Sequence, residues 1–241
     1  MSDVYVNPVI YFAKYKGEKL GISVMVLGES GRGKSRSMKN LNPEETLVIK
    51  AINKPFPFKS VDWKPCTKEN PKGSLYTSDN YDTIKKAMLM AKDLGKKVIV
   101  IDDAQYLMAN EFMNKSAVKG FDKFTEIAKN MWELITTANE KLDDDMRIYF
   151  LQHTETTATG EVKAKTIGKM LDDKITIEGM VTIVLNANLE SGNYFFTTQN
   201  SGNDTCKSPE DMFPEHRIDN DLRQVDDAIC EYYGIEKQKE K

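Results

Sequence analysis

The sequence predicts an α/β protein with a mostly parallel central sheet, helices on both faces and a C-terminal antiparallel hairpin. Three observations predict this fold class. Apolar, β-branched runs alternate with amphipathic helical stripes between residues 22 and 151. A glycine-rich segment, residues 28–35, directly follows the first apolar run. Polar residues with useful chemistry follow two later runs, and the carboxyl ends of parallel strands meet at one edge of a sheet.

The first half of the chain predicts strands and helices in alternation. Strands are expected at residues 9–12, 22–27, 47–50 and 98–101. A helix that begins near Lys34 is short, because Asn42-Pro43 ends it. Residues 53–73 carry four prolines and little periodicity, so they are expected to be irregular. A helical stripe runs from Tyr81 to Leu94, with Gly95 as its stop.

The second half begins with the strongest amphipathic stripe, which predicts a helix from Phe121 to Ile135 with Trp132 added to its core. A strand at 146–151 and a Thr-rich hairpin at 154–164 follow. Strands at 181–185 and 194–198 flank a turn, and a helix at 221–233 precedes a charged tail.

Composition describes an ordinary globular protein of 241 residues, 40% hydrophobic and 29% charged. A single domain is expected, with a core at about 20–200, a C-terminal helix at about 219–233 and a tail at 236–241. The net charge of −3 excludes a globally basic nucleic-acid binder. Three scattered cysteines, no signal peptide and no long apolar run predict a cytoplasmic protein that does not enter a membrane.

Residues 28–35 read G-x-x-x-x-G-K-S, the pattern of a phosphate-binding loop. Glycines after a strand let backbone amides turn inward around phosphates, and a helix start adds its unpaired amides. The ammonium of Lys34 would reach the β- and γ-phosphates, and the hydroxyl of Ser35 would bind Mg²⁺. The expected ligands are ATP and Mg²⁺, and a plain surface turn is the alternative. The residues expected to contact the nucleotide are Gly28, Glu29, Ser30, Gly31, Arg32, Gly33, Lys34, Ser35 and Arg36.

Two acids follow the apolar strand at 98–101. Asp102 is expected to hold the Mg²⁺ shell with Ser35, through water, because Mg²⁺ gives up its waters reluctantly. A solvated aspartate at a strand end is the alternative. Asp103 is expected to polarise an attacking water. Glu111 and Gln105 are its rivals, and a helix N-cap is its alternative role.

Gln152 and His153 end the strand at 146–151. One of them is expected to contact the γ-phosphate, and because successive side chains point to opposite faces only one can do so. Gln152 is preferred as a catalytic group beside Lys34 and Asp103, whereas a lone histidine is more often structural.

Lysines gather after the Thr-rich hairpin, at positions 163, 165, 169 and 174. They could contact DNA phosphates, and Lys163, Lys165 or Lys169 could reach the nucleotide of a neighbouring subunit. A solvated basic face balanced by Asp172 and Asp173 is the alternative.

The phosphate loop, Val98-Ile-Val-Ile-Asp-Asp-Ala-Gln-Tyr106 and Phe150-Leu-Gln-His-Thr154 together resemble the RecA-like, AAA-type P-loop ATPases of tailed phages. The nearest resemblance is to phage ATP-binding proteins associated with single-strand DNA annealing and recombination. Softer likenesses lie at 163–174 and 198–203. The resemblance implies a RecA-like core, Mg-ATP binding, assembly with other copies on DNA, and a bacterial host cytoplasm. The family's Lys-x-Lys pattern at subunit junctions would fall on Lys163 and Lys165.

One feature departs from the family pattern. RecA proteins carry a catalytic Glu after the strand that precedes the Asp-bearing strand, which is the second nucleotide motif and lies here at 98–102. In this sequence the preceding strand ends with Lys50-Ala-Ile-Asn53, which contains no acid. The leading hypothesis is an ATPase that couples ATP or ADP binding to single-stranded DNA and works with a recombination or single-strand-binding protein. A nucleotide-gated binding module with little turnover is the second hypothesis. A small-molecule kinase is the third, although its usual arginine-bearing lid is missing.

Overall fold

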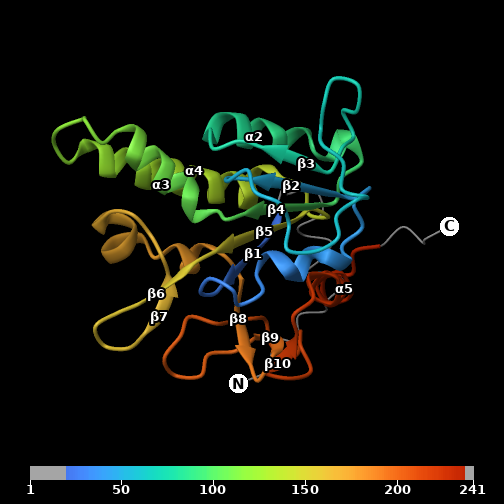
Figure 1. The fold of residues 1–241 in the computed structure, drawn as a ribbon. Coiled ribbons are helices and arrows are strands. Elements are labelled where there is room, and N and C mark those ends of the chain that lie inside the picture. The colour runs from blue at the N-terminus through green and yellow to red at the C-terminus, as the bar shows by residue number, and fades with distance from the viewer. Residues whose placement is uncertain (1–19, 237–241) are drawn as a thin grey trace, which may run out of the picture.

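The computed structural model describes residues 20–236, in which eight strands form one sheet of order β10-β9-β8-β1-β5-β4-β2-β3 (Figure 1). These strands are β1 (Ile22–Leu27), β2 (Thr46–Lys50), β3 (Leu75–Thr77), β4 (Val98–Asp102), β5 (Arg147–Gln152), β8 (Ile183–Glu190), β9 (Asn193–Thr197) and β10 (Arg217–Asp219). All pairs from β8 to β3 are parallel, whereas β8–β9 and β9–β10 are antiparallel. The predicted α/β class, with its mostly parallel sheet and C-terminal antiparallel hairpin, is confirmed.

Helices cover both faces of this sheet, as the sequence predicts. They are η1 (Ser35–Asn40), α2 (Tyr81–Met90), η2 (Lys92–Leu94), α3 (Gln105–Asn114), α4 (Asp122–Lys141), η3 (Leu171–Ile175), η4 (Ile177–Met180) and α5 (Leu222–Tyr233). In Figure 1, α2, α3 and α4 lie above the sheet, and η1 and α5 lie below it. A separate two-stranded hairpin, β6 (Thr154–Thr156) with β7 (Val162–Ala164), follows β5, which confirms the hairpin predicted at 154–164.

The core consists of two apolar layers because the central strands are buried on both faces. Along β1, Met25 and Leu27 pack with α2, α3 and α4, whereas Val24 and Val26 pack with η1 and α5. This alternation repeats on β4 and β5. The carboxyl ends of β1, β4 and β5 are thereby fixed side by side, which determines where the loops after them lie.

Most of the elements predicted within the described residues are confirmed, with small differences at their ends. The helix expected from Tyr81 to Leu94 is divided into α2 and η2, and Gly95 ends it with φ 80°. The short strands β3 and β10 were not predicted. The strand expected at 9–12 and the tail after residue 236 lie outside the described residues.

Two aromatic residues predicted to join the core of α4 are exposed, so that prediction is wrong. Phe121 is 86% exposed because it is the N-cap residue of α4, before the buried stripe of the helix begins at Ile127. Trp132 is 42% exposed because it lies beside, and not within, the buried stripe that includes Ile127, Met131 and Ile135.

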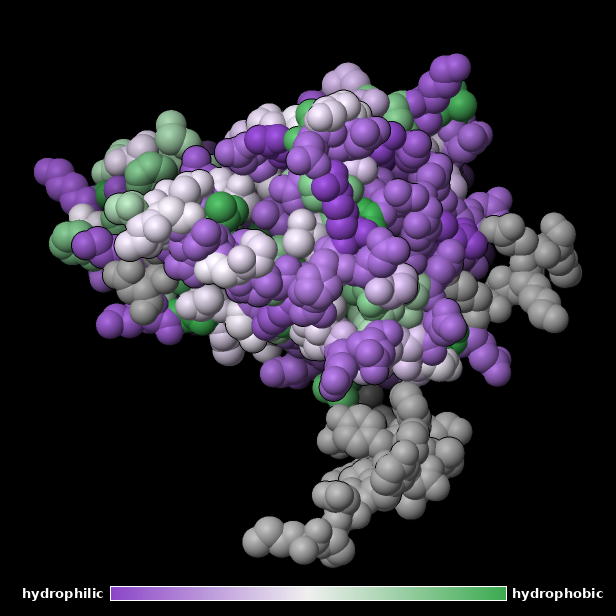
Figure 2. Space-filling model, turned by 90° about the horizontal axis from the view of Figure 1, so that it is seen from below, coloured by the Kyte–Doolittle hydropathy of each residue, from purple (hydrophilic) through white to green (hydrophobic). Residues whose placement is uncertain are grey.

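The end of α3 and the α3–α4 connection carry exposed apolar side chains. Met113 and Val118 are exposed in addition to Phe121. Seen from below, the molecule is largely hydrophilic, and hydrophobic colour gathers toward the left end, where the α3–α4 connection lies in Figure 1 (Figure 2). Among residues 20–236, no helix is both long enough and apolar enough to cross a membrane.

Candidate functional site

The glycine-rich loop joins the carboxyl end of β1 to η1, and its backbone is held by the neighbouring strand. The amide of Gly28 donates to the carbonyl of Gln152 over 3.2 Å. Gly31 and Gly33 have φ of 78° and 94°, a region that glycine adopts without strain. A Cβ atom on Gly33 would lie 2.7 Å from Cδ1 of Tyr194, so no larger residue fits there without displacement. The helix after the loop is short, as predicted, but it is a six-residue 3₁₀ helix.

Lys34 lies inside the bend of this loop. Its Nζ donates to the carbonyl oxygens of Gly28 and Glu29 over 2.7 and 2.9 Å. Burial lowers the pKa of Lys34 to about 8, against the opposing charges of Asp103 and Asp102. Within the described part of the chain, the amides of Gly31, Gly33 and Lys34 donate no hydrogen bond. The loop therefore combines an ammonium group with free backbone donors, the combination that binds a phosphate chain.

Ser35 and Asp102 come from the two separate motifs and are in contact. The Ser35 hydroxyl donates to Oδ1 of Asp102 over 2.7 Å, and Asp102 is only 2% exposed. Burial and the adjacent Asp103 raise the pKa of Asp102 to about 6, although the Ser35 hydrogen bond opposes this shift. Hydroxyl and carboxylate oxygens are the hard ligands that Mg²⁺ prefers, so this pair fits the predicted metal site.

Asp103 is buried in an unusual backbone conformation, with φ 58°. Its Oδ2 lies 2.5 Å from Nζ of Lys54, and its Oδ1 lies 3.7 Å from Nε2 of His153. Burial raises the pKa of Asp103, but the hydrogen bonds and charges of His153 and Lys54 lower it by more, so the carboxyl is ionised. Helix α3 begins after Ala104 without a side-chain cap, which argues against the N-cap role.

Lys54 is the residue of this site that the sequence analysis missed. It follows β2, whose register pairs Lys50 with Asp102 on β4, so the ends of both strands lie side by side. Lys54 lies four residues beyond the end of β2, the strand after which the family pattern has an acid. In the sequence, Lys54 is marked only by its position after a predicted strand. That position does not show which strand lies next to it, so it does not predict a contact with Asp103.

Gln152 and His153 point in different directions, as strand alternation requires. Gln152 is fully buried, and its Nε2 donates to the carbonyl of Lys165 over 2.8 Å. The ring of His153 lies against Asp103 and meets Tyr106 edge-on at 6.2 Å. Of these two side chains, His153, for which the sequence favoured a structural role, is therefore the one that lies beside Asp103.

The two rivals of Asp103 lie elsewhere on α3. Glu111 accepts hydrogen bonds from Lys115 and Asn130 over 2.6 and 2.8 Å, within the α3–α4 contact. Gln105 occupies the first turn of α3, and its Oε1 is buried without a hydrogen-bond partner among the described residues. Asp103 is thus the acid directly beside Asp102.

The charged loop residues point toward β8 and β9. Arg32 pairs with Glu29 at 2.8 Å and donates to the carbonyl of Leu189 over 3.0 Å. The guanidinium of Arg36 stacks over the ring of Tyr194, 4.7 Å from its centre. The side chains predicted to contact nucleotide therefore fall into an inner group around Lys34 and an outer group against the hairpin.

The lysines predicted at positions 163, 165, 169 and 174 lie on β7 and on the segment that follows it. Lys163 lies 3.7 Å from Glu155, whereas Lys165, Lys169 and Lys174 are exposed. The amide of Lys165 donates to the carbonyl of His153 over 2.8 Å. The backbone of this basic segment is therefore attached directly to the end of β5.

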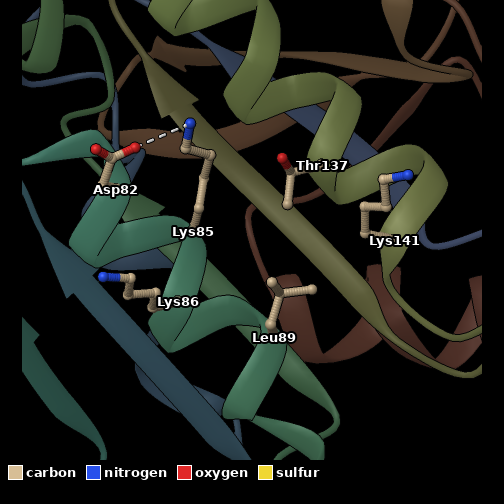
Figure 3. A pocket seen from close by; sticks show the side chains of 6 residues that line it. All are labelled: Asp82, Lys85, Lys86, Leu89, Thr137 and Lys141. Atoms are coloured by element: carbon tan, nitrogen blue, oxygen red, sulfur yellow. Dashed lines mark ion pairs between the residues drawn. The ribbon is translucent and has the colours of Figure 1, made fainter.

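A separate groove of about 510 Å³ lies between α2 and α4 (Figure 3). Its lining residues are Asp82, Lys85, Lys86, Leu89, Thr137 and Lys141. Lys85 pairs with Asp82 at 3.2 Å and with Glu133 at 3.0 Å. None of these residues belongs to the loop or to the strand ends, so the groove is distinct from the predicted site.

Comparisons with known proteins add little to this geometry. No protein-family model and no curated protein matches the chain. Among solved structures, the chain is similar to a KaiC-like protein from the hyperthermophilic archaeon Pyrococcus horikoshii, with 12% identity and a TM-score of 0.40. The match covers 75% of this chain and 79% of that one. A match at this TM-score carries no argument about function. The α/β fold class follows from the strand order and the parallel pairing of the sheet.

Proposed function

We propose that the protein is a P-loop ATPase that binds Mg-ATP and couples its nucleotide state to single-stranded DNA. The hydrogen bond between Ser35, the last residue of the glycine-rich loop, and Asp102 is the observation that carries this proposal. It brings together a hydroxyl from the phosphate loop and a carboxylate from the second motif, which are 67 residues apart in the sequence. A phosphate loop with this neighbour is suited to a nucleoside triphosphate chelated to a divalent cation.

Each group has a distinct chemical task in this proposal. Lys34 and the loop amides bind the β- and γ-phosphates, and Ser35 and Asp102 hold Mg²⁺, which offsets the charge on the phosphate oxygens. Asp103 or His153 accepts the proton of the attacking water. Because Asp103 directly follows Asp102, the predicted Mg²⁺ ligand that contacts Ser35, it is the better placed acceptor.

Coupling to DNA is supported by the connections of the segment after β7. Its backbone joins β5 through hydrogen bonds between Lys165 and both Gln152 and His153. The position of a Cβ on Gly168 lies 3.3 Å from Cβ of Phe124, so the segment also packs against the start of α4. Lys165, Lys169 and Lys174 on this segment are exposed, and exposed lysines are the side chains that bind the phosphates of a single strand. In an assembly of several copies, Lys163, Lys165 or Lys169 would reach a neighbour's nucleotide.

A nucleotide-gated binding module with little turnover is the second candidate function. The ion pair between Lys54 and Asp103 favours it, because an acid that holds an ammonium group is a poor proton acceptor. Tight ATP binding with negligible phosphate release would distinguish this module from an active ATPase.

Calorimetry with ATP, in the presence and absence of Mg²⁺, tests the proposed function. Lys34→Ala should abolish ATP binding, while Lys39→Ala, an exposed lysine on η1, should leave it unchanged. Phosphate release should depend on Mg²⁺ and rise when single-stranded DNA is added. Unchanged ATP affinity in Lys34→Ala would refute the site, and the absence of DNA binding with ATP present would refute the coupling.

A further inference from the structure

Lys54 lies in neither sequence motif, yet it contacts the predicted catalytic acid. Its side chain is 47% exposed, whereas that of Asp103 is 3% exposed, so the lysine reaches from the open side of the site to a buried carboxylate. Its backbone is held in place because the buried Lys50 donates from Nζ to the carbonyl of Lys54. The following segment is anchored by Phe56 and Trp63, whose rings are 6.0 Å apart. Lys54 is therefore a half-exposed cation whose backbone is held by the buried Lys50 and whose ammonium pairs with Asp103.

The two lysines of the site have different partners. Lys34 donates to two neutral carbonyls, whereas Lys54 forms an ion pair. Partial burial lowers the pKa of Lys54, but its hydrogen bond to Asp103 and the charges of both acids raise it by more. The ammonium of Lys54 is therefore charged, and it lies close enough to Lys34 for the two like charges to interact.

We infer that Lys54 recognises the terminal phosphate of ATP and that its move to this phosphate releases Asp103. This inference rests on the proposed function. The triphosphate would bind beside Lys34 and Ser35, and Asp103 follows directly on the Asp102 that contacts Ser35. A γ-phosphate, with its concentrated negative charge, competes with one carboxylate for the ammonium of Lys54. ADP lacks that group and leaves the Lys54–Asp103 pair in place.

Release of Asp103 has a chemical consequence. In hydrolysis, the oxygen of water bonds to the γ-phosphorus, and the bond from that phosphorus to the β–γ bridging oxygen breaks. The electron pair of the broken bond stays on ADP, and the proton of the water passes to the carboxylate of Asp103. A carboxylate that already holds an ammonium group accepts this proton poorly. The move of Lys54 to the γ-phosphate therefore leaves the carboxylate of Asp103 available to accept this proton.

The test compares Lys54→Met with Lys54→Arg and with Lys59→Met, an exposed lysine on the same irregular segment. Calorimetry gives the affinities for Mg-ADP and for a non-hydrolysable Mg-ATP analogue. Lys54→Met should weaken the analogue about 10- to 100-fold, the usual effect of losing a hydrogen bond to a charged group, and should change ADP affinity less than about twofold. Lys54→Arg should restore most of the preference for the triphosphate, and Lys59→Met should behave as wild type.

Each result is decisive. Equal losses for both nucleotides, or no loss for either, would overturn the role of Lys54 while leaving the proposed ATP site intact. If the wild-type protein binds neither nucleotide, the proposed function fails and the inference fails with it. Circular dichroism of each variant shows whether it is folded, and the ADP affinity of Lys54→Arg provides a second check of the intact site.

Discussion

The buried ion pair between Arg147 on β5 and Asp226 on α5 yields a prediction about stability. Arg147 donates from Nε and Nη2 to the two carboxylate oxygens of Asp226, over 2.9 and 2.8 Å. The hydroxyl of Tyr149 donates to the same carboxylate over 2.8 Å. Both charged side chains are 5% exposed, so Asp226→Ala leaves three buried donors without this acceptor.

The expected loss follows from this geometry. Breaking a buried pair by removing one partner costs about 3–5 kcal/mol, because the remaining charge stays buried. For a chain of this length, each kcal/mol lowers the melting temperature by about 2–4 °C, so Asp226→Ala should melt roughly 6–20 °C below wild type. The neighbouring Asp227 pairs with Arg223 at 3.2 Å and its side chain is 50% exposed, so Asp227→Ala should lose less than about 1 kcal/mol.

Urea unfolding followed by circular dichroism measures these free energies. The double variant Arg147→Met/Asp226→Leu removes both charges and replaces them with apolar volume, so it should be more stable than Asp226→Ala. The reasoning is refuted if Asp226→Ala loses less than about 1 kcal/mol, or if the double variant is less stable than the single one.

Two further predictions concern the loop and the basic segment. Gly33→Ala should lose about 1–3 kcal/mol of stability and most ATP affinity in melting and calorimetry, because its Cβ meets Tyr194 at a positive φ. Gly31→Ala, with nothing within 4 Å, is the milder control, and equal losses in both variants would contradict the steric argument. The pair Lys165→Ala/Lys169→Ala should weaken single-stranded DNA binding in fluorescence anisotropy and reduce the slope of log affinity against log salt by about 1.4. The pair Lys86→Ala/Lys141→Ala, in the groove between α2 and α4, should leave that slope unchanged, and the reverse outcome would place the DNA in the groove.

The central fold could be predicted because its strands are buried on both faces. Strands β1, β2, β4 and β5 are continuous apolar runs, and this pattern is hard to mistake when helical stripes separate them. The edge strands β3 and β10 have three residues each and are only partly buried, so they carry no such pattern. Phe121 fits the helical period, but it lies just before α4 begins. Periodicity alone does not show which part of an apolar stripe is covered by the rest of the protein.

The candidate site was predictable where one motif contains the whole chemistry. The phosphate loop and Asp102 are local patterns, and the rule that strand ends share one edge brings them together. The pair between Lys54 and Asp103 depends on β2 lying next to β4 in a particular register, which no local pattern specifies. Strand alternation predicts that Gln152 and His153 point to opposite faces, but which of them lies beside Asp103 depends on how β5 packs against its neighbours, and this too is a tertiary property.

Both loops of the site are tied to a single strand. The amide of Gly28 donates to the carbonyl of Gln152, and the amide of Ala104 donates to the carbonyl of Leu151 over 2.9 Å. Two consecutive carbonyls of β5 therefore hold the glycine-rich loop and the turn that follows Asp102 and Asp103. A displacement at the end of β5 is therefore transmitted to both loops through these two hydrogen bonds. Because one strand end holds both loops, a small shift of that end should change the distance from the serine hydroxyl to its carboxylate partner less than loss of either hydrogen bond would.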